Sequence, residues 1–171
     1  SSSFRTARGR PVDEIIAAAD RADLLIMGAA GHDIGVRFRP GPEALAAAER
    51  APRSVLLLRS GAVIEGRPLV AYDGSEQGDK ALEAAARMVR SRQGGVRVLI
   101  MAGGGDEDRT EALRGKALAI LEPFGINVRF TELGQATPDG MCRAVERSDA
   151  DLLVLAASDP SLGEGGFSRL L

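Results

Sequence analysis

Three of the four glycines between residues 27 and 44 have a spacing that could support phosphate binding. Gly28, Gly31 and Gly41 stand in the stretch MGAAGHDIGVRFRPGPEA, between the apolar run ADLLI and the helical pattern ALAAAER. Glycine allows left-handed backbone and close approach to a ligand. Successive N–H groups can form an anion nest, and a helix N-terminus suits a phosphate. The pattern therefore favours a phosphate-binding loop, with an ordinary strand-to-helix connection as the alternative.

A second group, Asp73-Gly74-Ser75, places a carboxylate and a hydroxyl after the apolar run PLVAY and before a helical pattern. Both side chains can accept hydrogen bonds. Asp and Ser are also the preferred residues just before a helix, where they satisfy free backbone N–H groups. Helix capping is therefore the competing explanation for this group.

Other residue patterns give no support for catalysis or metal binding. His32 is the only histidine and Cys142 the only cysteine, and they lie far apart in the sequence. No metal site or Cys–His pair is therefore expected. We interpret His32 as a solvent-facing loop residue and Cys142 as a small residue of a helix core. Three glutamates fall on separate predicted helices, without the paired spacing of acid–base catalysis: Glu14, Glu43 and Glu83.

Composition narrows the classes of partner. The 171-residue chain has a net charge of −2, 4% aromatic residues and no tryptophan. These values argue against nucleic acid and an anionic membrane as partners. No apolar run approaches the roughly 18 residues of a membrane span. With a single cysteine no intrachain disulfide can form, and we expect a cytoplasmic protein.

Short apolar runs alternate with alanine-rich periodic stretches, which predicts a parallel α/β architecture. The predicted strands are 23–27, 54–59, 68–72, 96–101, 127–131 and 151–155, with a further strand over residues 2–7. The predicted helices are 12–21, 43–50, 77–92, 109–124 and 139–148.

The sequence also contains an internal repeat. PVDEIIAAADRADLLIMGAAGHD at 11–33 resembles PDGMCRAVERSDADLLVLAASDP at 138–160. Such self-similarity predicts two copies of one α/β unit. The glycine-containing stretch SGAVIEGR at 60–67 is the predicted linker between them.

These segments resemble universal stress proteins. LVAYDGSEQGDKALEAA at 69–85 is similar to the first strand, DGS loop and first helix of that family. The stretch 22–59 is similar to the family's fourth strand, glycine loop, fourth helix and fifth strand. G-x2-G-x9-G is the family's nucleotide-binding signature, in which Ser or Thr normally follows the last glycine.

The resemblance implies a doubly wound parallel sheet with strand order 3-2-1-4-5, in two copies of which the first is partial. Residues 1–62 correspond to the closing half of a first domain, in which 2–7 supplies the third strand. Residues 67–171 correspond to a second domain without its last helix and strand. The sequence thus appears incomplete at both ends. Because the first copy lacks strands 1 and 2, we expect a partner chain or preceding residues to fill the gap.

The resemblance also implies a ligand site for an adenine nucleotide, ATP or AMP, with magnesium only alongside ATP. Gly28, Gly31 and Gly41 would contact ribose and phosphates. Asp73 would recognise the adenine edge, and Ser75 would help to shape the pocket.

The sequence departs from the family pattern at both loops. Pro42 stands where the family has Ser or Thr, so a hydroxyl and an N–H are missing. In the second copy Ala156 and Asp159 stand where the motif has glycines, and a carboxylate at Asp159 would repel phosphate. No complete site can therefore be assembled within one copy.

We predict a non-catalytic regulatory protein of the stress response. Its candidate ligand is an adenine nucleotide, bound in the first copy. The alternatives are a ligand-free dimerisation or interaction domain and a cytoplasmic regulatory fragment of a transporter. A slow ATP hydrolase has least support, since no P-loop lysine or general base stands beside the loop. The family's fifth strands pair across a dimer interface, which implies a homodimer or internal pseudo-dimer through Ser54–Arg59.

Overall fold

The computed structural model of the chain describes residues 3–4, 6–28, 41–58, 61–90, 94–102, 105–133 and 138–156. These residues form two compact units, the first ending at Ala62 and the second beginning at Val63. The division falls within the predicted linker, residues 60–67.

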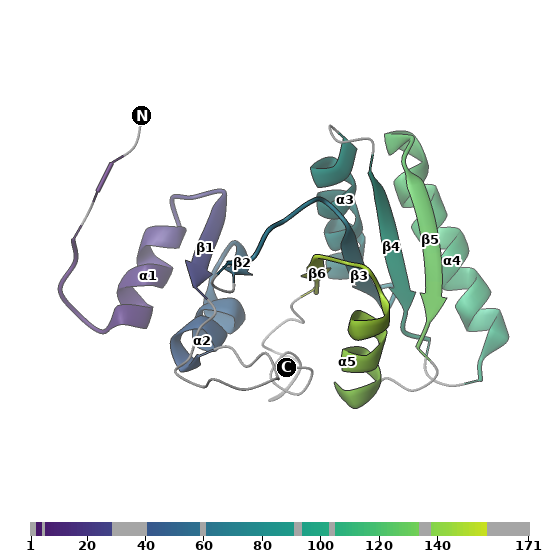
Figure 1. The fold of residues 1–171 in the computed structure, drawn as a ribbon. Helices are drawn as coiled ribbons and strands as arrows, with labels where there is room; N and C mark the ends of the chain where they lie inside the picture. Colours follow the sequence, from purple (N-terminus) through teal and green to yellow (C-terminus); the bar gives the residue numbers. More distant parts are fainter. Residues whose placement is uncertain are drawn as a thin grey trace. The chain divides into compact units, whose positions relative to one another are not determined.

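The first unit contains a parallel pair of strands and two helices (Figure 1). The strands are in register from Leu24 opposite Ser54 to Gly28 opposite Leu58. Both helices begin with proline. Proline suits the first helical position because an N–H there would have no acceptor within the helix, so its absence costs no hydrogen bond. The elements are α1 (Pro11–Ala19), β1 (Leu24–Gly28), α2 (Pro42–Arg50) and β2 (Ser54–Leu58).

The further strand predicted over residues 2–7 is wrong for the residues that the structure describes. Residues 3, 4 and 6–8 form neither helix nor strand. A strand needs a neighbour to bond its N–H and C=O groups. In the order that the resemblance implies, this segment would pair with a strand 2, and no described strand pairs with it.

The first unit has a very small core. Its buried hydrophobic residues, within the described ranges, are Ala19, Ala44 and Ala47. Leu24 and Ile26 on β1 are instead 44% and 57% exposed. Strands of a parallel sheet are normally buried on both faces, so this sheet presents apolar surface that the unit does not cover.

The second unit is a four-stranded parallel sheet in the order β5-β4-β3-β6. Its strands are β3 (Pro68–Tyr72), β4 (Gly95–Ile100), β5 (Asn127–Glu132) and β6 (Leu152–Val154). Its helices are α3 (Glu76–Arg90), α4 (Glu107–Leu121), the 3-10 turn η1 (Glu122–Phe124) and α5 (Pro138–Arg147).

Helices cover both faces of this sheet. Helices α3 and α4 pack on one face, and α5 packs on the other (Figure 1). On the first face the buried core includes Tyr72, Leu82 and Leu121. On the second face Leu69 and Leu99 meet α5. The strand β3 is buried along its whole length, as expected for a central parallel strand.

The α/β class and the parallel sheets are confirmed, and the six strands and five helices lie within a few residues of their predicted bounds. The order β5-β4-β3-β6 matches the 3-2-1-4 part of the order that the resemblance implies. The complete five-strand order, the two copies and their bounds at 1–62 and 67–171 stay predictions.

Candidate functional site

The loop Asp73-Gly74-Ser75 lies at the topological switch point of the sheet, where the strand order reverses and the connecting helices change from one face to the other. It leaves the carboxyl end of β3, between β4 on one side and β6 on the other. The helix that follows β3 covers one face of the sheet, whereas α5, which precedes β6, covers the opposite face. In open α/β sheets ligands bind in the crevice at such a point.

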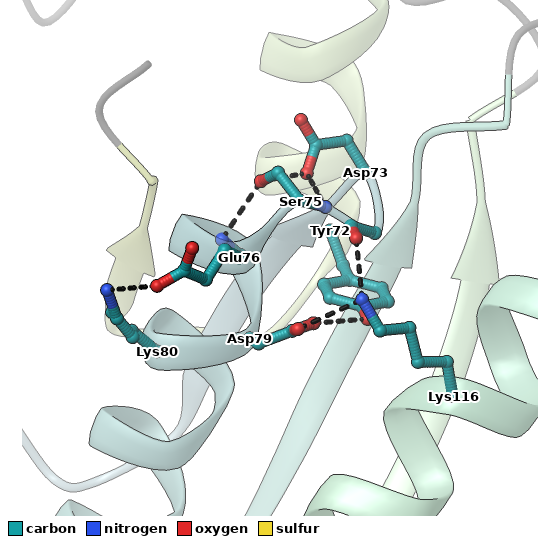
Figure 2. A network of polar contacts seen from close by, with 9 residues as sticks. Tyr72, Asp73, Ser75, Glu76, Asp79, Lys80 and Lys116 are labelled. Atoms are coloured by element: carbon teal, nitrogen blue, oxygen red, sulfur yellow. Dashed lines mark hydrogen bonds and ion pairs between the residues drawn. The ribbon is translucent and has the colours of Figure 1, made fainter. Parts of the chain in front are cut away.

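Ser75 is used as the cap of α3. Its Oγ accepts a hydrogen bond from the N–H of Gly78 at 3.0 Å, and its carbonyl accepts one from the N–H of Asp79 at 2.9 Å (Figure 2). A serine that bonds the third N–H of a helix is a standard N-cap. The capping explanation proposed for this residue from the sequence is confirmed by these contacts.

Asp73 holds the turn that leads into this cap. Its Oδ1 accepts hydrogen bonds from the N–H of Ser75 at 3.0 Å and from Ser75 Oγ at 2.7 Å. The other carboxylate oxygen points away from the turn, and the residue is exposed (Figure 2). One oxygen of Asp73 is thus committed to local structure, while the other faces outward.

Below the loop, a buried phenol and an ion pair join β3, α3 and α4. Tyr72 Oη donates to Asp79 Oδ1 at 2.7 Å, and Lys116 Nζ lies 2.9 Å from Asp79 Oδ2 (Figure 2). Lys116 Nζ also donates to the carbonyl of Gly74 at 2.7 Å. Lys116 thereby ties the loop to α4 and balances the charge of Asp79.

Burial raises the pKa of the Tyr72 phenol well above its ordinary value, and the hydrogen bond to Asp79 raises it further. The side chain is 0% exposed. The phenol therefore stays protonated at neutral pH and acts as a fixed donor, because a buried phenolate next to a carboxylate is strongly disfavoured. This network joins β3, α3 and α4 through the contacts of Tyr72 and Lys116 with Asp79.

The glycine loop of the first unit is described only at its two ends. Gly28 ends β1, and a Cβ built on it would meet no atom within 4 Å. Gly41 precedes α2 with extended backbone, and no side chain caps this helix. Pro42 is the first helical residue, one position before the predicted start at 43. Gly31 and His32 lie outside the described residues.

The predicted nucleotide residues are divided between the two units. Gly28 and Gly41 belong to the first unit, and Asp73 and Ser75 belong to the second. Ala156 packs against the core of the second unit, whereas Asp159 lies outside the described residues.

Sequence reasoning missed three residues of the second unit. Asp79 and Lys116 form the network under the loop, and Asp106 caps α4 by accepting from the N–H of Arg109 at 2.8 Å. A signal existed for Asp106, an acidic residue three positions before the capped N–H. Lys116 carried a weaker signal as one of only two lysines in the chain.

Within the described ranges, no cluster of three or more His, Cys, Asp or Glu side chains is arranged to hold a metal ion. Among the same residues, no helix combines the length and apolar character needed to cross a membrane.

No protein-family model matches the sequence, and no curated protein matches it significantly. Solved structures do match. A universal stress protein from Archaeoglobus fulgidus DSM 4304 superposes with a TM-score of 0.70 and 25% identity, over 88% of this chain and 58% of that chain. This chain thus spans little more than half the length of that neighbour.

Two further neighbours match more weakly. A universal stress protein from Archaeoglobus fulgidus gives a TM-score of 0.49 at 25% identity, over 61% of this chain and 86% of that chain. The universal stress protein from Archaeoglobus fulgidus in complex with dAMP gives 0.40 at 18% identity, over 55% of this chain and 99% of that chain.

The parallel α/β architecture and the match to the DSM 4304 protein together define the class: this chain has the fold of universal stress proteins.

Proposed function

We propose that this chain is a non-catalytic regulatory protein of the universal-stress-protein type, which binds an adenine nucleotide at the loop between β1 and α2. The observation that carries the proposal is the geometry at the two ends of this loop. A parallel strand ends at an open glycine, Gly28, and the next helix begins after Gly41 without a side-chain cap. A glycine without neighbours at its Cβ position lets a ligand approach the backbone closely, and the first N–H groups of an uncapped helix suit a phosphate.

Pro42 sets a limit on the affinity. With proline at the first position of α2, the next amides available to a phosphate are those of Glu43 and Ala44. The missing hydroxyl and N–H remove two donors, each worth roughly 1.5–3 kcal/mol when bonded to a charge. We therefore expect ATP or AMP to bind weakly, with magnesium required only for ATP.

Asp73 and Ser75 take a structural role in this proposal. The Ser75 hydroxyl already bonds Asp73 and Gly78, so a ligand would have to compete with the cap of α3. The regulatory role in a stress response and a cytoplasmic location stay predictions.

Analysis of bound nucleotide tests the proposal. The purified full chain is denatured, and the released nucleotide is quantified; the native chain is also titrated with ATP and AMP while its thermal stability is followed. Gly28→Asp places a carboxylate where the phosphates would lie, and we expect it to abolish binding. Gly115→Asp adds the same charge to α4, at another glycine whose Cβ would meet nothing within 4 Å.

Ligand at a hundred times its dissociation constant adds about 2.7 kcal/mol of stability, so binding is readily detected. If wild type carries no nucleotide and millimolar ATP does not stabilise it, the loop is not a nucleotide site. If Gly28→Asp binds nucleotide as tightly as wild type, the nucleotide site does not include Gly28 and lies elsewhere in the chain. Magnesium-dependent phosphate release that is lost in a Gly31 variant would instead indicate hydrolysis.

A second candidate function is association through the first unit. Leu24 and Ile26 on β1 are exposed, and no described strand pairs with the outer edge of β1 or of β2. An open strand edge with apolar side chains is a pairing surface for another chain. The family resemblance implies a homodimer or internal pseudo-dimer through Ser54–Arg59. The structure describes Ser54–Leu58 of this segment as the strand β2.

The association state separates this candidate from the first. We expect wild type to sediment as a dimer or larger species, and Ile26→Lys to shift it toward the monomer. Met88→Lys is the matched control, because Met88 on α3 is also exposed, at 44%. A monomeric wild type, or equal dissociation by both variants, would contradict association through β1.

A further inference from the structure

The internal repeat makes β1 of the first unit the counterpart of β6 in the second. The run ADLLIM at 22–27 aligns with ADLLVL at 150–155, so Asp23 corresponds to Asp151. In both places a helix that begins with proline, α1 or α5, precedes the strand. The second unit therefore shows how a strand of this sequence is paired when a neighbour occupies its edge.

In the second unit, Asp151 anchors the chain segment that enters β3. Its Oδ2 accepts a hydrogen bond from the N–H of Glu65 at 2.8 Å, and its Oδ1 accepts one from the N–H of Arg67 at 3.0 Å. The Asp151 side chain is only 8% exposed, and Arg67 Nε lies 3.4 Å from its Oδ2. Between the two donors, Gly66 has a φ of 91°, a left-handed conformation that favours glycine. One carboxylate thus holds two N–H groups and a cation at the start of the strand.

Beyond this anchor, β3 pairs with β6 in parallel. The paired positions are Pro68 with Leu152, Leu69 with Leu153, and Val70 with Val154. Leu153 packs against the core on one face of the sheet, and Val154 packs against the core on the other. The neighbouring strand and its helices therefore cover the apolar side chains of β6.

The strand β1 carries the same features without such a neighbour. Asp23 is exposed, and within the described ranges its carboxylate forms no hydrogen bond or ion pair. Ile26, the counterpart of Val154, is 57% exposed, and Leu24 is 44% exposed. An unused carboxylate and uncovered apolar side chains thus lie along one strand.

The winding of the chain indicates which edge of β1 is free. Helices α1 and α2 contact each other, so both lie on one face of the β1–β2 sheet. Right-handed crossovers through helices on one face add strands in a single direction. β2 therefore continues the sheet away from the edge that corresponds to the β3 side of β6. No described strand pairs with that edge of β1.

We propose that this free edge of β1 binds an extended segment of a partner polypeptide as a parallel strand, and that the Asp23 carboxylate anchors the start of the strand. The segment that fits has the pattern at 66–72, where glycine and arginine precede proline and a run of apolar residues. Its arginine complements the charge of Asp23, and two backbone N–H groups satisfy both carboxylate oxygens. Strand addition to an open edge is a recurring mode of peptide recognition. This role rests on the second candidate function, association through β1, and specifies its partner.

A synthetic peptide with the sequence of residues 64–73, IEGRPLVAYD, tests the proposal. Its binding to the full chain is followed by the fluorescence anisotropy of a C-terminal label, and we expect saturation at one site per chain. Asp23→Ala should weaken binding about tenfold or more, since two charge-assisted hydrogen bonds are lost. Asp23→Asn keeps one acceptor oxygen without the charge and should bind with intermediate affinity. Asp23 is exposed, so the fold should persist, which circular dichroism can verify.

Asp20→Ala is the matched control, because it removes the same charge from a nearby exposed residue of the first unit. It should bind the peptide like wild type. A second peptide carries N-methyl groups at the positions of Glu65 and Arg67 and so lacks the two N–H donors. Wild type should bind it as weakly as Asp23→Ala binds the unmodified peptide. Asp23→Ala should bind the two peptides with equal affinity.

Three outcomes would overturn the proposal: no binding of the unmodified peptide, equal weakening by Asp23→Ala and Asp20→Ala, or equal binding of the two peptides to wild type. Sedimentation distinguishes these failures from a failure of association through β1. If Ile26→Lys shifts wild-type dimers toward the monomer but the peptide does not bind, association through β1 stands and the anchored parallel strand is wrong. If wild type is monomeric and the peptide does not bind, both are wrong.

Discussion

At the scale of single residues, the hydroxyl of Ser75 illustrates how a motif residue can serve the fold. We predict that Ser75→Ala lowers the free energy of unfolding by about 1 kcal/mol, because α3 loses its N-cap. Ser75→Asn, which keeps an acceptor at this position, should lose much less. Urea denaturation measures both. If Ser75→Ala left the free energy of unfolding unchanged and yet abolished nucleotide binding, the hydroxyl would serve a ligand instead of the helix.

Tyr72 gives a second prediction at this scale, because it is the only tyrosine in the chain. Its folded pKa is raised by burial and by Asp79, so the native protein should not ionise it at the ordinary value of about 10. The stability associated with Tyr72 is fully present below that pH and falls as pH rises further. We expect tyrosinate absorbance to appear only together with unfolding.

Near-ultraviolet absorbance and circular dichroism, followed in one alkaline titration, measure this directly. Tyr72→Phe should lose less stability between neutral and alkaline pH than wild type, although it starts from a lower value because Asp79 loses a donor. Tyrosinate that forms near pH 10 in a still native protein would contradict the burial of the phenol.

At the scale of elements, Lys116 couples two helices and a loop. It reaches from α4 to Asp79 on α3 and to the carbonyl of Gly74. A double-mutant cycle with Lys116→Met and Asp79→Asn should give a coupling energy of about 0.5–1 kcal/mol, because both side chains are partly exposed. The pair Glu76 and Lys80, exposed on one helix, should give less. Additive effects in the first cycle would mean that the contact does not stabilise the packing of α3 on α4.

The elements also show which features a sequence can reveal. β3 was predictable because PLVAY is a short, continuous apolar run, and α2 because an alanine-rich stretch follows Pro42. The strand predicted over 2–7 is absent from the described residues of that range, since strand formation depends on a distant neighbour that local pattern does not reveal. The contact of Lys116 with Asp79 joins positions 37 apart in sequence and was likewise hidden. The pairing of Arg97 with Arg129 across β4 and β5 was hidden too, because it depends on the strand register, which sequence alone leaves open.

At the scale of the whole molecule, apolar burial is distributed unevenly between the two units. In the described part of the first unit only alanines are fully buried, whereas the second unit buries Tyr72, Leu69, Leu82 and Leu99. Burying a leucine contributes roughly 1.5–3 kcal/mol, and an alanine methyl group far less. A two-stranded sheet is also marginal by itself. The first unit should therefore be the less stable part of the chain.

Native-state hydrogen exchange on the full chain tests this last prediction. Amides of β3, β4 and α3 should exchange most slowly, at the rate of global unfolding, whereas those of β1 and β2 should open more easily. If the first unit is completed by association, raising the protein concentration should slow exchange in β1 and β2 and leave β3 and β4 unchanged. Exchange in β1 as slow as in β3, at every concentration, would show that the first unit is stable by itself. The three buried alanines would then be an insufficient account of its stability.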